Sequence, residues 1–329
     1  MKKSVKIMMI VALALILAGG VLLLGGCVIF GAESFEHGAQ EYREKTYDMT
    51  EQSFENIWVQ TNVADVSLLP STDDHCRVVC YESNKMYHTV EVKNGTLVIR
   101  AVDSRKWYDH IGLIFEDMKV TIYLPASDYA TLQVDTDTGK ITVPSGFAFS
   151  SVTLESDTGA VEFGATSRGT MHLCTDTGAI RMSDAAAQRL QVESDTGSIR
   201  AERLTVTETM VLESDTGSIE LHTVQAAALQ VSSDTSAVRM EDVIIAGNLS
   251  IETHTGGIEL RDSDAQTLHI ESTTGSVYAS LLTPKICYAS SDTGKVDVPQ
   301  SYEGGRCEVE TDTGSIYIEF PYGTALADP

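Results

Sequence analysis

Hydrophobic and polar residues alternate with period two over most of the chain, and the alternation is interrupted at regular intervals by Asp-Thr-Gly or a close variant. Residues five and seven positions before each glycine are apolar, and so are residues two and four positions after it. This pattern predicts two short β-strands that flank a corner and share one inward face. We expect the glycine to allow a positive φ at the corner.

Aligning the chain on this glycine gives ten copies of one unit, spaced 19 or 20 residues apart. A unit of this size cannot bury its own inward face, whereas a stack of identical units closes a continuous core. The sequence therefore predicts an all-β protein with a single parallel β-solenoid, one repeat per coil. The general preference for right-handed crossovers favours a right-handed coil. The repeat centres are Gly139, Gly159, Gly178, Gly197, Gly217, Ser236, Gly256, Gly275, Gly294 and Gly314.

The chain is expected to form one folded domain behind an N-terminal anchor. Residues 1–32 are predicted to be the anchor and residues 33–46 a short juxtamembrane segment. Residues 47–329 are predicted to be the solenoid domain, with divergent coils and a cap over 47–130 and the ten regular repeats over 131–320. Within the divergent part, VQTNVADV matches the repeated unit and Asn94-Gly95 predicts a tight turn between strands.

Three lysines, Lys2, Lys3 and Lys6, precede an uncharged run of 26 residues from Ile7 to Ala32. The run is longer than the roughly 20 residues that a membrane-spanning helix needs. An uncleaved, single-pass signal anchor with a cytoplasmic N-terminus and an extracytoplasmic solenoid follows from the positive-inside rule. The run also contains Leu-Gly-Gly-Cys, so a lipoprotein attached through Cys27 is the alternative, with the same topology.

The net charge of the chain narrows the classes of molecule that it can bind. With 47 acidic and 23 basic residues the net charge is −24, which argues against nucleic acid as a partner. The expected partners are the membrane, through the N-terminal helix, and a protein or glycan of the cell envelope.

Five cysteines besides Cys27 exclude a complete disulfide framework. Cys76 and Cys80 are predicted to be buried thiols, too far apart along one strand to bridge.

Eight of the ten corners carry Asp two positions before the glycine, whereas His254 and Thr273 occupy the other two. So many equivalent positions do not form the facing carboxylate pair of an aspartic protease. Alternation points the Ser or Thr before each Asp inward, to bond between coils, and the Asp outward, to close an Asx turn. The functional alternative is Ca²⁺ between neighbouring carboxylates, in a column that His254 and Thr273 would interrupt. The column consists of Asp137, Asp157, Asp176, Asp195, Asp215, Asp234, Asp292 and Asp312.

One loop before the repeats is a candidate binding patch. It contains Trp107, Tyr108, Asp109 and His110, which could bind a ligand or cover the open end of the core. The sequence contains no Ser-His-Asp set, P-loop, Cys-x-x-Cys pair or His-Glu-x-x-His run. We therefore expect no enzyme activity, no catalytic residue and no cofactor other than the Ca²⁺ considered above.

From Tyr47 to Phe320 the sequence resembles the bacterial putative-adhesin family, a β-helical domain of unknown function found on Gram-positive membrane proteins. The resemblance is carried by the repeated Ser/Thr-x-Thr-Gly-x-Ile/Val unit, by VQTNVADVSLLPS and by RKWYDHIGL. It implies a non-enzymatic, membrane-anchored surface protein that binds envelope components, proteins or cells. Two other functions stay open: an accessory or sensory protein of the cell envelope, and a calcium-dependent carbohydrate-active enzyme.

Overall fold

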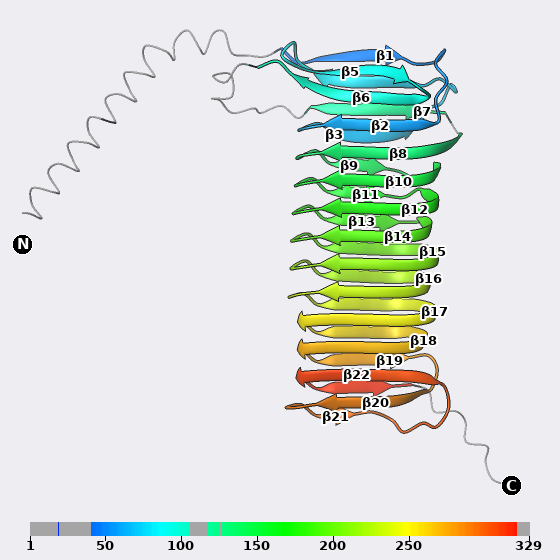
Figure 1. Cartoon of the computed structure of the whole chain (residues 1–329), viewed down its shortest axis with the longest axis vertical. Helices are drawn as coiled ribbons and strands as arrows, with labels where there is room; N and C mark the ends of the chain where they lie inside the picture. The colour runs from blue at the N-terminus through cyan, green and yellow to red at the C-terminus, as the bar shows by residue number, and fades with distance from the viewer. Residues whose placement is uncertain (1–18, 20–40, 106–117, 126, 321–329) are drawn as a thin grey trace, which may run out of the picture.

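The computed structural model describes residues 19, 41–105, 118–125 and 127–320. Its β-strands belong to one 23-stranded sheet that winds into a rod (Figure 1). Neighbouring coils pair in parallel, one repeat per coil, so the predicted all-β solenoid is confirmed. The predicted anchor over residues 1–32 lies outside the residues described apart from Gly19. Within the described ranges no helix has the length and apolar character to cross a membrane.

The regular coils occupy the middle of the rod. Each has a long strand before the Asp-Thr-Gly corner and a strand after it, and in β15 to β18 the second strand continues into the next coil as one element. The strands are β8 (Asp128–Thr136), β9 (Ile141–Val143), β10 (Ala148–Ser156), β11 (Val161–Phe163), β12 (Thr166–Thr175), β13 (Ile180–Ser183), β14 (Ala186–Ser194), β15 (Ile199–Ser214), β16 (Ile219–Ser233), β17 (Val238–Thr255), β18 (Ile258–Thr274) and β19 (Val277–Leu281).

The core runs along the rod axis because the inward residues of successive coils are register partners. Val192 pairs with Leu212, and Leu212 pairs with Val231, and all three are fully buried. The same ladder continues through the other coils, so every coil both covers and is covered by a neighbour. This stacking supplies the buried apolar area that a single 20-residue unit lacks.

The corner glycines are required by close packing, and the predicted positive φ is wrong for all of them except Gly314. A Cβ atom at Gly197 would lie 1.7 Å from the carbonyl oxygen of Gly178 in the preceding coil. At Gly178 the corresponding distance to the Gly159 oxygen is 2.0 Å. Left-handed backbone instead occurs six positions after the corner, where Asp184 and Arg203 have φ of 56° and 53°.

The N-terminal end is closed by a cap, which contains the antiparallel strand pairs found among the described residues. β2 and β3 form the first coil and stack on β8 and β9, as the VQTNVADV match predicts. Asn94 and Gly95 join the antiparallel strands β5 and β6, as predicted. Cys76 and Cys80 are buried free thiols, as predicted. The strands are β1 (Arg43–Asp48), β2 (Asn56–Thr61), β3 (Asp65–Pro70), β4 (Arg77–Glu82), β5 (Met86–Lys93), β6 (Thr96–Asp103) and β7 (Lys119–Leu124).

At the C-terminal end the last two coils are stacked in reverse of their sequence order. Strand β22 (Gly305–Thr313) pairs with β18 on one side and with β20 (Lys285–Ser291) on the other. Likewise, β23 (Ile316–Glu319) lies between β19 and β21 (Val296–Asp297). The final segment of the solenoid is therefore inserted into the rod, and the coil that precedes it in sequence forms the end (Figure 1).

Candidate functional site

The regular corner is held by its inward hydroxyl. Ser194 is buried, and its Oγ accepts a hydrogen bond from the Gly197 N–H at 2.9 Å. In the preceding coil the Thr175 Oγ1 accepts from the Gly178 N–H and donates to the Gly159 carbonyl at 3.2 Å. The predicted inward hydroxyls and their bonds between coils are confirmed.

The threonine before each glycine also bonds between coils. The Thr196 N–H and Oγ1 both donate to the backbone carbonyl of Asp176, at 2.8 and 3.2 Å. Thr216 makes the same pair of bonds to Asp195, at 2.9 and 3.2 Å. The backbone of the Asp residue is therefore engaged, whereas its side chain is exposed.

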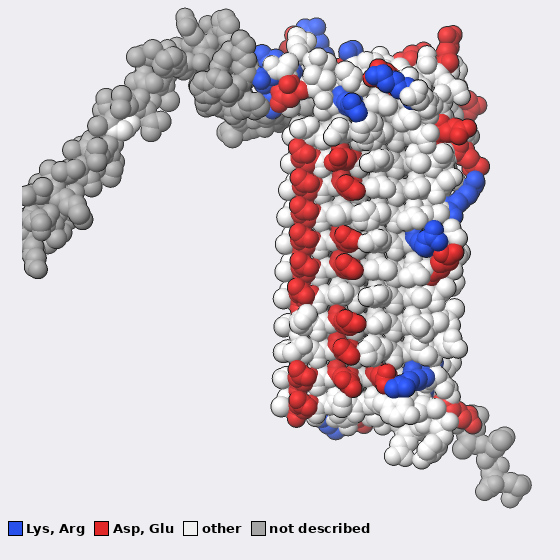
Figure 2. Space-filling view, in the orientation of Figure 1, with Lys and Arg blue, Asp and Glu red and all other residues white. Residues whose placement is uncertain are grey.

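The corner carboxylates point outward, as predicted, but the predicted Asx turns do not form. In the described coils none of these carboxylates accepts a hydrogen bond from its own turn. At the regular corners the buried hydroxyl already accepts the glycine N–H. Among the described residues, Asp234 is the one member of the column with an ion-pair partner, the His254 Nδ1 at 3.2 Å. The column is an exposed row of negative charge along one edge of the rod (Figure 2).

A second acidic column runs beside the first. It lies four positions before each glycine, on the same outward face of the long strands, and seven of its ten members are acidic. The members are register partners from coil to coil. In spatial order they are Asp135, Glu155, Cys174, Glu193, Glu213, Ser232, Glu252, Glu271, Glu310 and Ser290. We call these two columns together the acidic edge (Figure 2).

Three adjacent corners on this edge have a different conformation. Strands β17, β18 and β22 extend to Thr255, Thr274 and Thr313, which are register partners, whereas β15 and β16 end at their buried serines. The Gly256 N–H donates to the Thr274 carbonyl at 3.0 Å, and the Gly275 N–H to the Thr313 carbonyl at 2.9 Å. Backbone pairing with the next coil thus replaces the bond to the inward hydroxyl.

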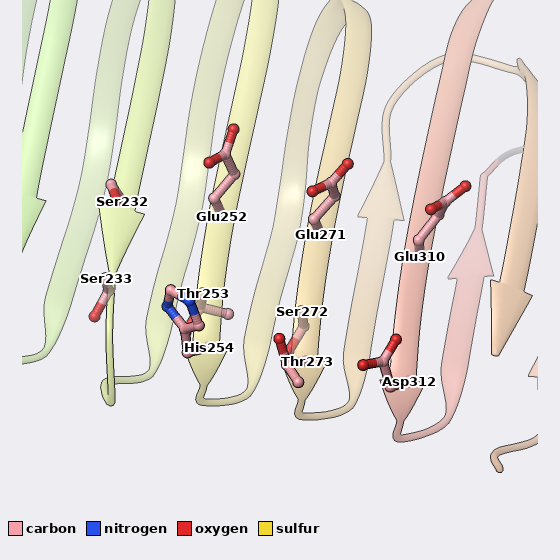
Figure 3. Close-up of a pocket in the computed structure, with 10 residues that line it drawn as sticks. All are labelled: Ser232, Ser233, Glu252, Thr253, His254, Glu271, Ser272, Thr273, Glu310 and Asp312. Carbon is pink, nitrogen blue, oxygen red and sulfur yellow. The ribbon is translucent and has the colours of Figure 1, made fainter. Parts of the chain in front are cut away.

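A groove of about 240 Å³ lies over these extended corners (Figure 3). Its lining contains four carboxylates, and no lysine or arginine belongs to it. Glu271 lies between Glu252 and Glu310 as the register partner of both. The groove is lined by Ser232, Ser233, Glu252, Thr253, His254, Glu271, Ser272, Thr273, Glu310 and Asp312.

Two hydroxyl groups of the groove have no hydrogen-bond partner among the described residues. They are the Thr253 Oγ1 and the Ser272 Oγ, on side chains that are each only 5% exposed. Burying a hydroxyl without a partner costs roughly 1–3 kcal/mol. In both of these corners the glycine N–H, which elsewhere donates to such a hydroxyl, is bonded to a carbonyl of the next coil.

The sequence-predicted residues fall into three groups. Asp312, from the predicted column, lines the groove, and His254 and Thr273, predicted to interrupt that column, line it too. The other corner aspartates lie along the edge outside it. The predicted patch, Trp107 to His110, and Cys27 lie outside the described residues. The groove carboxylates Glu252, Glu271 and Glu310 were missed, although acidic residues recur at their repeat position.

A buried polar cluster in the cap is a weaker candidate. Cys80, Glu82 and His88 bring ligand-type atoms within 4.8 Å of one another. Both ring nitrogens of His88 already have partners, Glu82 at 3.3 Å and Thr61 at 3.2 Å. Burial lowers the pKa of His88 against the effect of Glu82, and burial raises the pKa of the Cys80 thiol to about 12. A neutral imidazole and a protonated thiol fit a structural network that seals the cap.

Comparison with known proteins finds a family model that matches most of this chain. Residues 54–279 and 207–326 match the family model described as Toastrack DUF4097. This match confirms the resemblance to a β-helical adhesin-like family. No curated protein matches the chain.

The chain is also similar in outline to several solved structures. A putative lipid binding protein from Parabacteroides distasonis is 14% identical, with 87% of this chain and 98% of that one covered and a TM-score of 0.46. A putative adhesin from Bacteroides fragilis is 16% identical, covering 84% and 97%, with a TM-score of 0.41. A putative adhesin from Parabacteroides distasonis is 12% identical, covering 85% and 98%, with a TM-score of 0.39. At these values no functional detail carries over.

Proposed function

The chain belongs to the Toastrack DUF4097 family, and from this premise we propose that it is a non-catalytic, membrane-anchored binding module that works outside the cytoplasm. Its acidic edge binds basic partners of the envelope through many weak contacts along a rigid rod. The observation that carries the proposal is the register of the two acidic columns, which together place at least one carboxylate in every regular coil, at a coil spacing of about 4.8 Å. The N-terminal lysines and apolar run support the location.

Multivalency supplies the affinity in this proposal. One exposed ion pair contributes at most about 1 kcal/mol, so a single Asp or Glu cannot hold a partner. A partner with repeated positive charges engages several coils at once, and each further contact is intramolecular. The parallel coils keep the carboxylates in fixed register, which limits the conformational cost of binding.

The groove supports the non-catalytic part of the proposal. His254 makes its ion pair with Asp234, and the unpartnered hydroxyls of Thr253 and Ser272 have no base in hydrogen-bond contact within the described structure. Nucleophilic catalysis needs a hydroxyl activated by such a base. The arrangement is therefore suited to binding.

The test measures binding of lysine oligomers of 4, 8 and 16 residues to the full chain in detergent micelles. We expect affinity to rise at least tenfold with each doubling of length, and to fall as salt is raised. A variant that removes four carboxylates from the edge should lose at least tenfold in affinity for the longest oligomer. This variant combines Glu193→Gln, Asp195→Asn, Glu213→Gln and Asp215→Asn.

The matched control removes four carboxylates from strands that follow the corners, and should lose less than threefold. Equal losses in both variants would show that only net charge matters and would overturn the proposal, as would an affinity that is independent of oligomer length. The control combines Glu162→Gln, Glu202→Gln, Glu220→Gln and Glu241→Gln.

A further inference from the structure

Two cysteines lie side by side in the last two coils of the rod. Cys287 of β20 and Cys307 of β22 are register partners in these parallel strands (Figure 1). Both occupy the position seven residues before a corner glycine, where the other eight repeats carry Leu, Val or Met. The reversed order of the coils places Cys307 between Leu268 and Cys287 in this column. The column therefore ends in a pair of neighbouring thiols.

The geometry of this pair allows a bond between the two sulfur atoms. Cys307 is 1% exposed, and Cys287 packs against the same core but is only partly covered, because β22 is the pairing partner of β20 among the described strands. Register partners on neighbouring strands are about 4.8 Å apart. Disulfides join residues whose Cα atoms are roughly 4.4–6.8 Å apart. The bond can thus form without a change in register.

The two thiols differ in reactivity. Their mutual hydrogen bond lowers the pKa of Cys287 against the effect of burial, and the Lys285 ammonium group lowers it further. The same hydrogen bond and burial raise the pKa of Cys307. Lys285 is held at the start of β20 by an ion pair with Asp264 at 2.6 Å. The more exposed cysteine is therefore the better nucleophile, because the thiolate is the reactive form.

The other described cysteines have no comparable neighbour among the described residues. Cys76 and Cys80 are four positions apart along the chain, roughly 13 Å in extended backbone, which is too far for a disulfide. The register partners of Cys174 are Glu155 and Glu193. Burial, with these two carboxylates nearby, raises the pKa of the Cys174 thiol to about 11.

We propose that Cys287 and Cys307 form a disulfide that fastens the terminal coil to the rod. The oxidant is an external disulfide compound. The Cys287 thiolate attacks one of its sulfurs, forms a mixed disulfide and releases one thiolate. The Cys307 thiol then loses its proton, and its sulfur attacks Cys287 and displaces the second thiolate. The protein dithiol gives up two electrons and two protons, and the external disulfide becomes two thiols.

The disulfide closes a covalent loop that contains most of β20, all of β21 and the connection to β22. The coil formed by β20 and β21 is covered on one side only, so it can open locally without disturbing the rest of the rod. Closing the loop restricts the opened chain and favours the closed coil. In the cell the reaction rests on the proposed location outside the cytoplasm, where such bonds persist.

The test treats the full chain in detergent micelles with oxidised glutathione, alkylates the remaining thiols and digests the protein with trypsin. Trypsin cleaves after Lys295 and Arg306, so the two cysteines fall on separate peptides that a disulfide holds together. We expect mass spectrometry to find the linked peptides in most chains. Hydrogen exchange in β20 should be at least tenfold slower than in the reduced chain, and exchange in β15 should be unchanged.

In Cys287→Ala, hydrogen exchange in β20 should not respond to the oxidant. The matched control is Cys174→Ala, which should form the linked peptides as the unmodified chain does. Melting in a reducing buffer checks that both variants fold. Because the oxidant is added, the result depends neither on where the protein resides nor on the binding of lysine oligomers. Alkylated Cys287 and Cys307 after oxidation, glutathione retained on Cys287, or linked peptides without slower exchange in β20 would each overturn the proposal.

Discussion

The corners at Gly197 and Gly275 differ within the turn in a single residue and use different hydrogen bonds. Both read Ser-x-Thr-Gly, with Asp195 in the first and Thr273 in the second. At Gly197 the serine of the same turn accepts the glycine N–H, whereas at Gly275 a carbonyl of the next coil accepts it. The second arrangement continues the strand by two residues.

In this pair of corners, the acceptor of the glycine N–H determines whether the serine oxygen has a hydrogen-bond partner. A β-branched Thr273 favours extended backbone, while Asp favours a turn. Asp312 also lies in an extended corner, because Thr313 pairs with Thr274 of the neighbouring coil. The corners at Gly197 and Gly275 both provide an acceptor for the glycine N–H, but only the corner at Gly275 leaves its serine hydroxyl without a partner.

The largest expected effect tests the close stacking of the regular corner. Gly197→Ala places a methyl group 1.7 Å from a backbone oxygen, so the coils must separate, which costs about 3 kcal/mol or more. The melting temperature, measured in EDTA, should fall by on the order of 10 °C. The control is Gly257→Ala, where the nearest atom is 3.7 Å away and no loss is expected. Similar stability for both variants would contradict the packing argument.

An intermediate effect on stability distinguishes an inward hydroxyl that accepts a glycine N–H from one that has no partner. Ser194→Ala leaves the buried Gly197 N–H without its acceptor, and we expect a loss of about 1–3 kcal/mol in the free energy of unfolding. Ser272→Ala removes an oxygen that has no partner, so in EDTA its stability should equal or exceed that of the unmodified chain. Chemical denaturation of both variants measures the difference, and equal losses would refute the distinction.

A smaller effect concerns the threonine before the glycine. Thr196→Val removes the hydroxyl bond to the Asp176 carbonyl but keeps the N–H bond, so we expect a loss of about 1 kcal/mol. Thr255 shares only the backbone bond, to the Asp234 carbonyl, so Thr255→Val should change the unfolding free energy by less than half as much. The same denaturation assay applies, and a larger loss at Thr255 would be the contrary result.

The smallest effect is electrostatic and depends on pH. Burial, with Asp137 and Asp157 nearby, raises the pKa of Asp135 above its usual value. The folded state therefore favours the protonated form, and the ionised carboxylate costs stability at neutral pH. Asp135→Asn should melt slightly higher than the unmodified chain at pH 7, and this advantage should shrink as the pH falls through the raised pKa. If the difference in melting temperature between Asp135→Asn and the unmodified chain stays constant from pH 7 to pH 4, the raised pKa of Asp135 is not its cause.

The solenoid could be predicted from the sequence because each coil repeats one local pattern. Apolar residues such as Val192 and Leu212 recur at the same place in each repeat, and stacking is the only way to bury them all. The same alternation correctly separated inward Ser194 from outward Asp195. The repeat pattern predicted a positive φ as the reason for the corner glycines, and this reason was wrong. The close approach of Gly178 to Gly197 depends on how two coils pack, so no local pattern in the sequence indicates it.

The groove was only half predictable. His254 and Thr273 are visible in the sequence as breaks in the aspartate column. The contact between Glu271 and Glu310 is not visible, because in sequence order the neighbour of Glu271 would be Ser290. Both candidate neighbours fit the repeat equally well, so the local pattern cannot choose between them.

The reversed order of the last two coils also constrains how the protein is made. Chains are synthesised from the N-terminus, and units that contact only their neighbours can add to a growing stack one by one. This route extends here as far as β19. The next coil, β20 and β21, has its partners in β22 and β23, which emerge later. Assembly of the end of the rod must therefore wait for Glu319, so a ribosome that stalls earlier releases a chain with an unfinished, aggregation-prone edge.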